Sequence, residues 1–152
     1  MIQRIQTIYL LISLILLGLI AWLPLGEVAV GDHIYQFTIK GISSDQTQKM
    51  VYNGLPLIIL TGIILMLQIV VIFSFKNRIR QMRLATFNLL LMLGILGVSW
   101  FFVHSAMKTL GEGVYQFRLP MSFPIIGAIL NYLAIRAIGK DEALVRSVDR
   151  IR

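Results

Sequence analysis

Polar side chains within the long apolar stretches are the first candidates for chemistry. The largest of them are the amides of Gln68, Asn88 and Asn131, which donate and accept hydrogen bonds but do not titrate. Each lies five to eight residues from a cation at the edge of its apolar stretch, so we expect all three in the cytoplasmic half of the membrane and the two asparagines at nearly the same depth. The simplest role for them is hydrogen bonding between helices, which holds the helices in register. Contact with a partner helix and a substrate site are the alternatives. Smaller polar residues within these stretches include Ser13, Thr61 and Ser99.

Residues that usually carry cofactor or metal chemistry are scarce. The chain has no cysteine, which excludes disulfides, thiol redox cycles and iron–sulfur sites. Its two histidines are His33, in an expected outer loop, and His104, near the outer end of the third expected helix, and neither position suits bis-histidine haem ligation inside the bundle. We find no Ser–His–Asp set, glycine-rich phosphate loop or pair of membrane carboxylates. The sequence therefore predicts no catalytic residue, no cofactor and no metal site.

Composition and the length of the apolar stretches indicate a membrane protein. Of the 152 residues, 57% are hydrophobic and 14% are charged, whereas soluble domains are about one quarter charged. The uncharged stretches predict four membrane-spanning helices in a single domain, at about residues 5–26, 54–75, 84–106 and 120–138. The first stretch is longer than the apolar region of a signal peptide, so we expect an uncleaved anchor. Small residues that would allow close helix approach are Gly94, Gly97, Gly127 and Ala128.

The placement of charge predicts the orientation of these helices. The two ends of the chain and the middle loop carry ten lysines and arginines against three acidic residues. The loops at 27–53 and 107–119 carry four of each. Because cytoplasmic loops carry an excess of lysine and arginine, we expect both termini in the cytoplasm and the two larger loops outside. Topology thus accounts for the positive charge, and no nucleic-acid partner is expected.

The outer loops contain strand patterns. Residues 27–39 alternate in polarity and break at Gly31-Asp32, which predicts a β-hairpin, while residues 41–48 are polar and are expected to form a loose crossover. Residues 114–119 are also β-prone and would add a third strand. The triplet at 35–37 recurs at 115–117, which indicates either an internal repeat or a preference for aromatic residues at a membrane interface. The candidate outer-sheet residues are Tyr35, Phe37, Tyr115 and Phe117.

The cytoplasmic side offers a basic and partly apolar surface. Gly139 is expected to end the fourth helix, and the tail 139–152 is expected to form a separate short helix with an apolar stripe. Such a helix lies on anionic lipid head groups or docks on a protein partner. The candidate lipid or partner surface consists of Arg78, Arg80, Arg83, Leu144, Arg146, Val148, Arg150 and Ile151.

The two ends of the chain resemble a known family. The opening Met1 to Leu11 (MIQRIQTIYLL) and the closing Asn131 to Arg152 (NYLAIRAIGKDEALVRSVDRIR) resemble an uncharacterised family of small four-span bacterial inner-membrane proteins, classed as a domain of unknown function. This resemblance implies a multi-pass protein of the bacterial inner membrane and brings no established activity or ligand.

Together these features predict a four-helix membrane bundle with a small antiparallel β-hairpin or three-stranded sheet on its outer face. The function expected first is that of a non-enzymatic accessory or scaffold subunit of a membrane complex, with the lipid bilayer, a membrane-protein partner or a second copy of the chain as contacts. A small oligomeric channel or transporter is the alternative. A membrane enzyme acting on a lipid or quinone would need a polar pocket.

Overall fold

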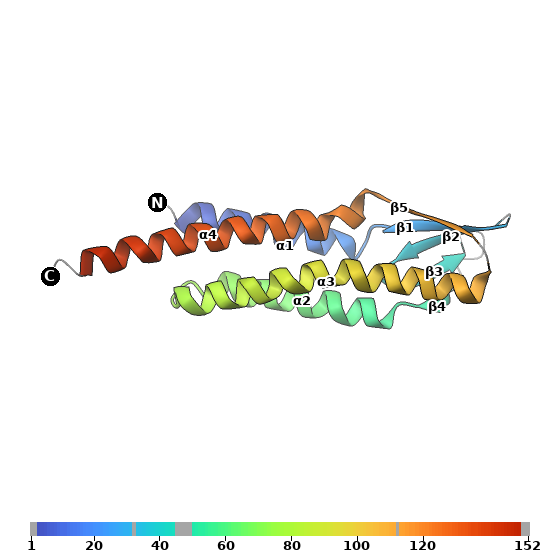
Figure 1. Ribbon diagram of the computed structural model, residues 1–152, viewed down its shortest axis with the longest axis horizontal. Coiled ribbons are helices and arrows are strands. Elements are labelled where there is room, and N and C mark those ends of the chain that lie inside the picture. The colour runs from blue at the N-terminus through green and yellow to red at the C-terminus, as the bar shows by residue number, and fades with distance from the viewer. Residues whose placement is uncertain (1–2, 32, 45–49, 112, 150–152) are drawn as a thin grey trace.

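The computed structural model describes residues 3–31, 33–44, 50–111 and 113–149. This part of the chain is mostly helical, with one five-stranded antiparallel sheet (Figure 1). The helices are α1 (Gln3–Ile20), α2 (Leu55–Phe73), α3 (Arg78–Leu110) and α4 (Phe123–Asp149), and a short 3-10 helix, η1 (Leu119–Ser122), leads into α4. The strands are β1 (Gly26–Val30), β2 (His33–Thr38), β3 (Gly41–Ser44), β4 (Met50–Asn53) and β5 (Val114–Phe117).

The helices pack lengthwise against one another, in the cyclic order α1–α4–α3–α2. The start of α1, the turn between α2 and α3 and the last turns of α4 lie at one end of the molecule, and the sheet lies at the other (Figure 1). We call the first of these the basic end, because it carries the cations at the start of α3 and in the second half of α4. The last turns of α4 project past the other helices (Figure 1).

Three helical segments are long and apolar enough to cross a membrane. They are Leu55–Phe73, Arg78–Leu110 and Leu119–Ala143, while the apolar segment described in α1, Ile5–Ile20, is shorter. Pro56 lies in the first turn of α2, where its missing N–H has no helical partner to lose.

The sheet joins strands from two separate segments of the chain, β1 to β4 before α2 and β5 after α3, with strand order β4-β3-β2-β1-β5. The expected hairpin, β1 and β2, and the expected third strand, β5, are present. The expected number of strands was wrong, because residues 41–44 and 50–53 add β3 and β4. The strand β3 has no alternating pattern of its own and is specified by its register with β2. Gly41 makes this corner possible: its φ is +130°, and a Cβ there would lie 2.0 Å from the Tyr52 carbonyl oxygen. The rest of the expected loose crossover, residues 45–48, lies outside the described residues.

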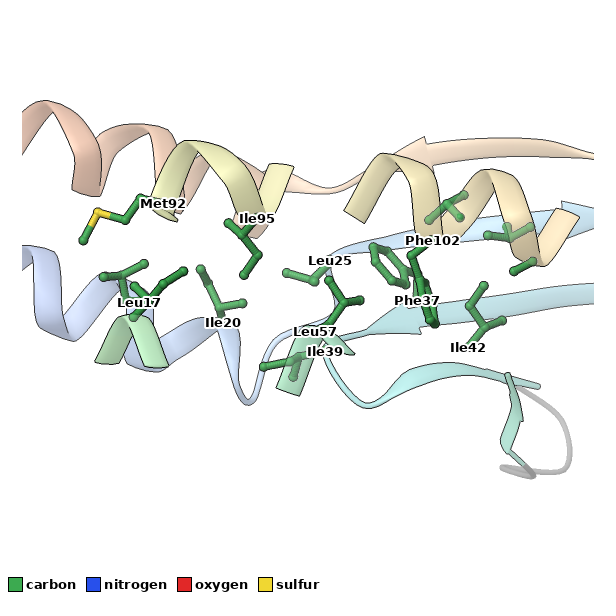
Figure 2. Packing of buried hydrophobic residues seen from close by; sticks show 14 of the residues in the cluster. Leu17, Ile20, Leu25, Phe37, Ile39, Ile42, Leu57, Met92, Ile95 and Phe102 are labelled. Carbon is green, nitrogen blue, oxygen red and sulfur yellow. The ribbon is translucent and has the colours of Figure 1, made fainter. Parts of the chain in front are cut away.

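One apolar core connects the sheet to the helices. In Figure 2, Leu17 and Ile20 of α1 approach Met92 and Ile95 of α3, and farther along Phe37 of β2 packs on Phe102 of α3. The Phe37 and Phe102 rings are stacked with centroids 5.8 Å apart. The sheet therefore packs on the end of α3 that lies nearest to it.

Three helix boundaries differ from those expected. The first helix ends at Ile20 rather than near residue 26, since Pro24 has no N–H to continue the ladder and the Leu25 N–H bonds the Phe37 carbonyl instead, at 2.8 Å. The third helix begins at Arg78, six residues before the apolar stretch. Charged residues such as arginine interrupt an apolar stretch, but they are good helix formers and do not interrupt the helix. Gly139 does not stop α4, which continues to Asp149; one helical glycine costs only about 1 kcal/mol relative to alanine.

Candidate functional site

The four helices point a regular stripe of side chains at one another. Buried positions recur at alternating spacings of four and three residues, the pattern of left-handed helix packing. On α2 the stripe includes Thr61, Ile64 and Gln68, and on α3 it includes Asn88, Met92 and Ile95. Polar side chains are part of the stripe on every helix. The buried polar residues among those described are Gln6, Ser13, Thr61, Gln68, Ser74, Gln81, Asn88, Ser99 and Asn131.

The outward faces of the same helices are apolar. Gln68 is 0% exposed whereas Met66, two residues earlier, is 72% exposed, and Asn88 is 0% exposed whereas Leu90 is 59% exposed. Soluble proteins place their residues the other way round, with apolar groups inside and polar groups outside. The described helices therefore bury their amide side chains and expose a largely apolar outer surface.

The amides of Gln68, Asn88 and Asn131 form one hydrogen-bonded group in the interior, which we call the amide cluster. Asn88 Nδ2 and Asn131 Nδ2 donate to Gln68 Oε1 at 2.7 and 3.1 Å. In return, Gln68 Nε2 donates to Asn131 Oδ1 at 3.2 Å and to the Leu10 carbonyl oxygen at 3.0 Å. The cluster thus ties α2 to all three other helices, with Gln68 at its centre.

Two buried oxygens in this interior have no hydrogen-bond partner, Asn88 Oδ1 and Thr61 Oγ1. Amide and hydroxyl oxygens can accept hydrogen bonds but cannot exchange protons near neutral pH. In the described part of the chain, no group of three or more His, Cys, Asp or Glu residues is arranged to hold a metal ion. The buried polar side chains described in this interior are thus uncharged hydrogen-bonding groups.

The interior is divided into a polar half and an apolar half. The amide cluster and Ser13, whose hydroxyl donates to the Gly127 carbonyl oxygen at 3.3 Å, lie toward the basic end. Toward the sheet the space between the helices is filled by an apolar group of buried side chains (Figure 2). Two polar side chains, Thr61 and Ser99, are also buried in this half of the described helices. The apolar side chains there include Leu17, Ile20, Leu57, Ile64, Ile95 and Phe102.

Close packing occurs at only some of the expected small residues. A Cβ on Gly127 would lie 3.1 Å from Ser13 Oγ, so this glycine sets the distance between α1 and α4. Ala128 is also buried. Gly94 and Gly97 are exposed, and a Cβ on either would meet nothing within 4 Å. The expectation that these two bring helices together within one chain was wrong.

At the sheet end of the molecule, the two matching triplets lie on either side of β1. Val28 pairs with Tyr35 and with Tyr115, and Gly26 pairs with Phe37 and with Phe117. The two sides are not equivalent, because Phe37 is 1% exposed and belongs to the core, whereas β5 is an edge strand whose residues are all exposed. Of the two triplets, the one on β5 is therefore the more exposed.

The two histidines each have a different aromatic neighbour. His104 stacks on Trp100 with centroids 5.5 Å apart, and Trp100 Nε1 donates to the Tyr115 hydroxyl at 3.2 Å. His33 meets Tyr35 edge-on, with centroids 6.5 Å apart. These contacts explain both imidazoles as members of aromatic groups at the sheet end.

The expected cytoplasmic surface is divided between two helices. Arg78, Arg80 and Arg83 lie in the first two turns of α3 rather than in a loop. Leu144, Arg146 and Val148 belong to α4, but their side chains lie outside the described structure, as do Arg150 and Ile151 entirely. The tail is thus a continuation of α4 as far as Asp149.

Sequence analysis missed two polar contacts at this end. Gln6 Nε2 donates to Asp141 Oδ2 at 2.7 Å, which ties α1 to the part of α4 beyond Gly139. Gln81 Nε2 donates to the Val71 carbonyl oxygen at 3.0 Å, which ties the starting turns of α3 to the end of α2. Gln6 lies at the start of the first uncharged stretch and Gln81 lies just before the third. Both continue the four-and-three spacing of the buried positions, and this spacing was the signal available to find them.

Comparison with known proteins places the chain in a family and assigns it no activity. Searches of curated proteins and of solved structures found no match. The model of a family described as a domain of unknown function, DUF4293, matches residues 2–151. Because this match covers almost the whole chain, the protein belongs to the DUF4293 family.

Proposed function

We propose that this protein is an integral membrane protein that acts, without enzymatic activity, as an accessory or scaffold subunit of a membrane complex. The observation that carries the membrane assignment is the reversed polarity of the helices, with buried amides inside and exposed isoleucine, leucine and phenylalanine outside. The helix α2 has 19 residues, which span about 28 Å, close to the roughly 30 Å of a bilayer core. Exposed apolar surface of this extent is costly in water and favourable in lipid.

The orientation follows from charge. Arg78, Arg80, Arg83 and Arg136 belong to the same end of the molecule as both chain ends, and the family resemblance implies a bacterial inner membrane. Positive charge at one end supports a cytoplasmic position for that end, with the sheet outside. The helix α3 has 33 residues, about 50 Å, so its outer turns would leave the bilayer and support the sheet.

A scaffold role is favoured over transport because the interior is packed rather than open. The amide cluster satisfies most of its own hydrogen bonds, and apolar side chains fill the half nearer the sheet. Coupled transporters hold a titratable group within the membrane, and the buried polar residues described here are all uncharged. What the fold offers to other molecules is surface, at β5 and at the basic end.

A small oligomeric channel or transporter is the second candidate. Asn88 Oδ1 and Thr61 Oγ1 favour it, since two partnerless acceptors inside a helical protein can bind a small neutral solute that donates hydrogen bonds. Such a function would need a path through the apolar half or between copies of the chain. Flux of small neutral solutes into proteoliposomes tests it directly.

The scaffold proposal is tested by mild detergent extraction at native expression level followed by native mass measurement. The full chain is compared with a chain that ends at Ala143, which keeps the contact between Gln6 and Asp141. A second pair places a lysine on the sheet, Val114→Lys on the β5 edge and Ile34→Lys on β2, an interior strand, as the matched control; both positions flank Ala29.

A partner of fixed stoichiometry that is lost with Val114→Lys but kept with Ile34→Lys supports a scaffold that uses its sheet edge. Loss only on truncation places the contact on α4. Recovery of the same monomer or homo-oligomer from every variant would contradict the scaffold proposal.

A further inference from the structure

A small groove opens at the basic end between three helices. It has a volume of about 230 Å³ and lies between the start of α1, the end of α2 and the first turns of α3. This is smaller than a typical drug-sized site of about 300–1,000 Å³ and is suited to a compact group. The lining residues are Gln6, Thr7, Ile72, Phe73, Phe75, Arg78 and Gln81.

Arg78 gives the groove its charge. Its Nη1 is buried and has no hydrogen-bond partner, although a guanidinium carries five N–H donors. A cationic donor removed from water without a partner is strongly unfavourable, and a bound anion relieves that cost. Arg78 also lines a second, adjacent cavity, which Glu142 and Lys76 share. The guanidinium therefore lies between two spaces that a ligand can enter.

The other charged groups at this end leave the groove positive. Glu142 lines the second cavity, and Asp141 accepts a hydrogen bond from Gln6, so neither carboxylate lines the groove itself. Lys76, Arg80 and Arg83 are exposed nearby, at the end of α2 and along the first turns of α3. An incoming anion is thus attracted by several cations and meets one of them inside the groove.

The apolar part of the lining indicates what the anion is attached to. Phe73 and Phe75, which are 73% and 61% exposed, also line the groove. Exposed phenylalanine side chains contact the acyl chains of a lipid, whereas a free phosphate ion makes no favourable contact with them. A phosphate carried by two acyl chains satisfies both parts of the lining.

We propose that the Arg78 groove binds the phosphate head group of an anionic phospholipid from the cytoplasmic leaflet, with the acyl chains against Phe73 and Phe75. Basic pockets between helices on the cytoplasmic side suit such head groups. The hydrogen bond from Gln81 to the Val71 carbonyl fixes the end of α2 beside the start of α3 and so preforms the groove. This site rests on the proposed membrane insertion and does not depend on a protein partner.

The experiment is native mass spectrometry of the purified full chain in mild detergent with added phosphatidylglycerol or phosphatidylcholine. Arg78→Gln is compared with Arg80→Gln, which removes the same charge two residues away at an exposed position outside the lining. The wild type is expected to retain phosphatidylglycerol in preference to phosphatidylcholine. Arg78→Gln should lower that retention about tenfold, as expected when one charge-assisted hydrogen bond is lost, and Arg80→Gln should change it less than twofold.

Equal losses in the two variants would show diffuse charge attraction and overturn the site. Displacement of the lipid by millimolar inorganic phosphate would overturn it in favour of a free-anion site. Elution volume and helical circular dichroism of each variant show that the fold is intact, and a gentler substitution, Arg78→Lys, should keep part of the retention. Recovery of the wild type in the soluble fraction, measured before lipid is added, would instead contradict membrane insertion.

Discussion

Replacement of Gln68 by methionine, which has a similar shape, should be more destabilising than replacement of the whole amide cluster. The change removes four hydrogen bonds, with lengths of 2.7, 3.0, 3.1 and 3.2 Å. At about 0.6 kcal/mol for each bond between membrane helices, the direct loss is about 2.4 kcal/mol. It also leaves the Asn88 amide buried without a partner and the Asn131 amide with only its weak hydrogen bond to Met92 Sδ, at 3.5 Å, which raises the expected loss to about 3–4 kcal/mol.

The triple variant Gln68→Met, Asn88→Leu, Asn131→Leu removes the hydrogen bonds together with the buried amides that would otherwise lose their partners. Because apolar replacement of all partners is close to neutral, its loss should stay below about 1.5 kcal/mol. Asn88→Leu alone should cost about 1 kcal/mol or less, since it breaks one bond and also removes the partnerless Oδ1.

The assay is reversible unfolding in mixed micelles of increasing SDS content, followed by far-ultraviolet circular dichroism. The free energies of unfolding of the wild type, the single variants and the triple variant are compared under one condition. A triple-variant loss equal to or greater than that of Gln68→Met would refute the reasoning that the cluster stabilises through mutual satisfaction.

Three further predictions concern packing, backbone and topology. Gly127→Val should lower the free energy of unfolding by about 2 kcal/mol, measured by thermal unfolding, because its side chain meets Ser13 across the α1–α4 contact. The control Gly97→Val, which faces open space, should lower it by under about 1 kcal/mol. Similar losses at both sites would contradict this. Gly41→Ala should open the sheet to limited proteolysis, since a Cβ would lie 2.0 Å from the Tyr52 carbonyl oxygen, while Gly31→Asn, at φ +58° with nothing within 4 Å, should leave the digestion pattern unchanged. Because the chain has no cysteine, Ile34→Cys and Arg80→Cys each introduce a single thiol that reports topology. A membrane-impermeant maleimide added to intact spheroplasts should label the cysteine at position 34, and should label the cysteine at position 80 only after the membrane is opened. The reverse pattern would show the opposite orientation.

The sequence carried enough information to find the amides but not their pairing. A glutamine or asparagine inside an apolar stretch stands out by residue type alone, so Gln68, Asn88 and Asn131 were identifiable. Which amide donates to which depends on the relative rotation of three helices, and the central position of Gln68 is a property of their packing.

Elements whose formation depends on distant partners were harder to predict. Residues 41–44 become a strand because β2 and β4 lie on either side of them, and four residues with a glycine carry little strand preference of their own. The helix boundaries at Arg78 and beyond Gly139 were missed for another reason. Hydropathy reports where apolar side chains stop, while a helix continues as long as its backbone hydrogen bonds are favourable.

The position of β1 between β2 and β5 sets an order for folding. Its first partner, β2, follows within the same loop, but its second partner, β5, begins 84 residues after the last residue of β1, beyond α2 and α3. During synthesis, therefore, one side of β1 has unpaired backbone groups until most of the chain has emerged. Contacts so distant in sequence form slowly, and an open strand edge is prone to wrong pairing in the interval. Closure of β5 onto β1 is consequently the step that commits the two halves of the chain to a single native structure.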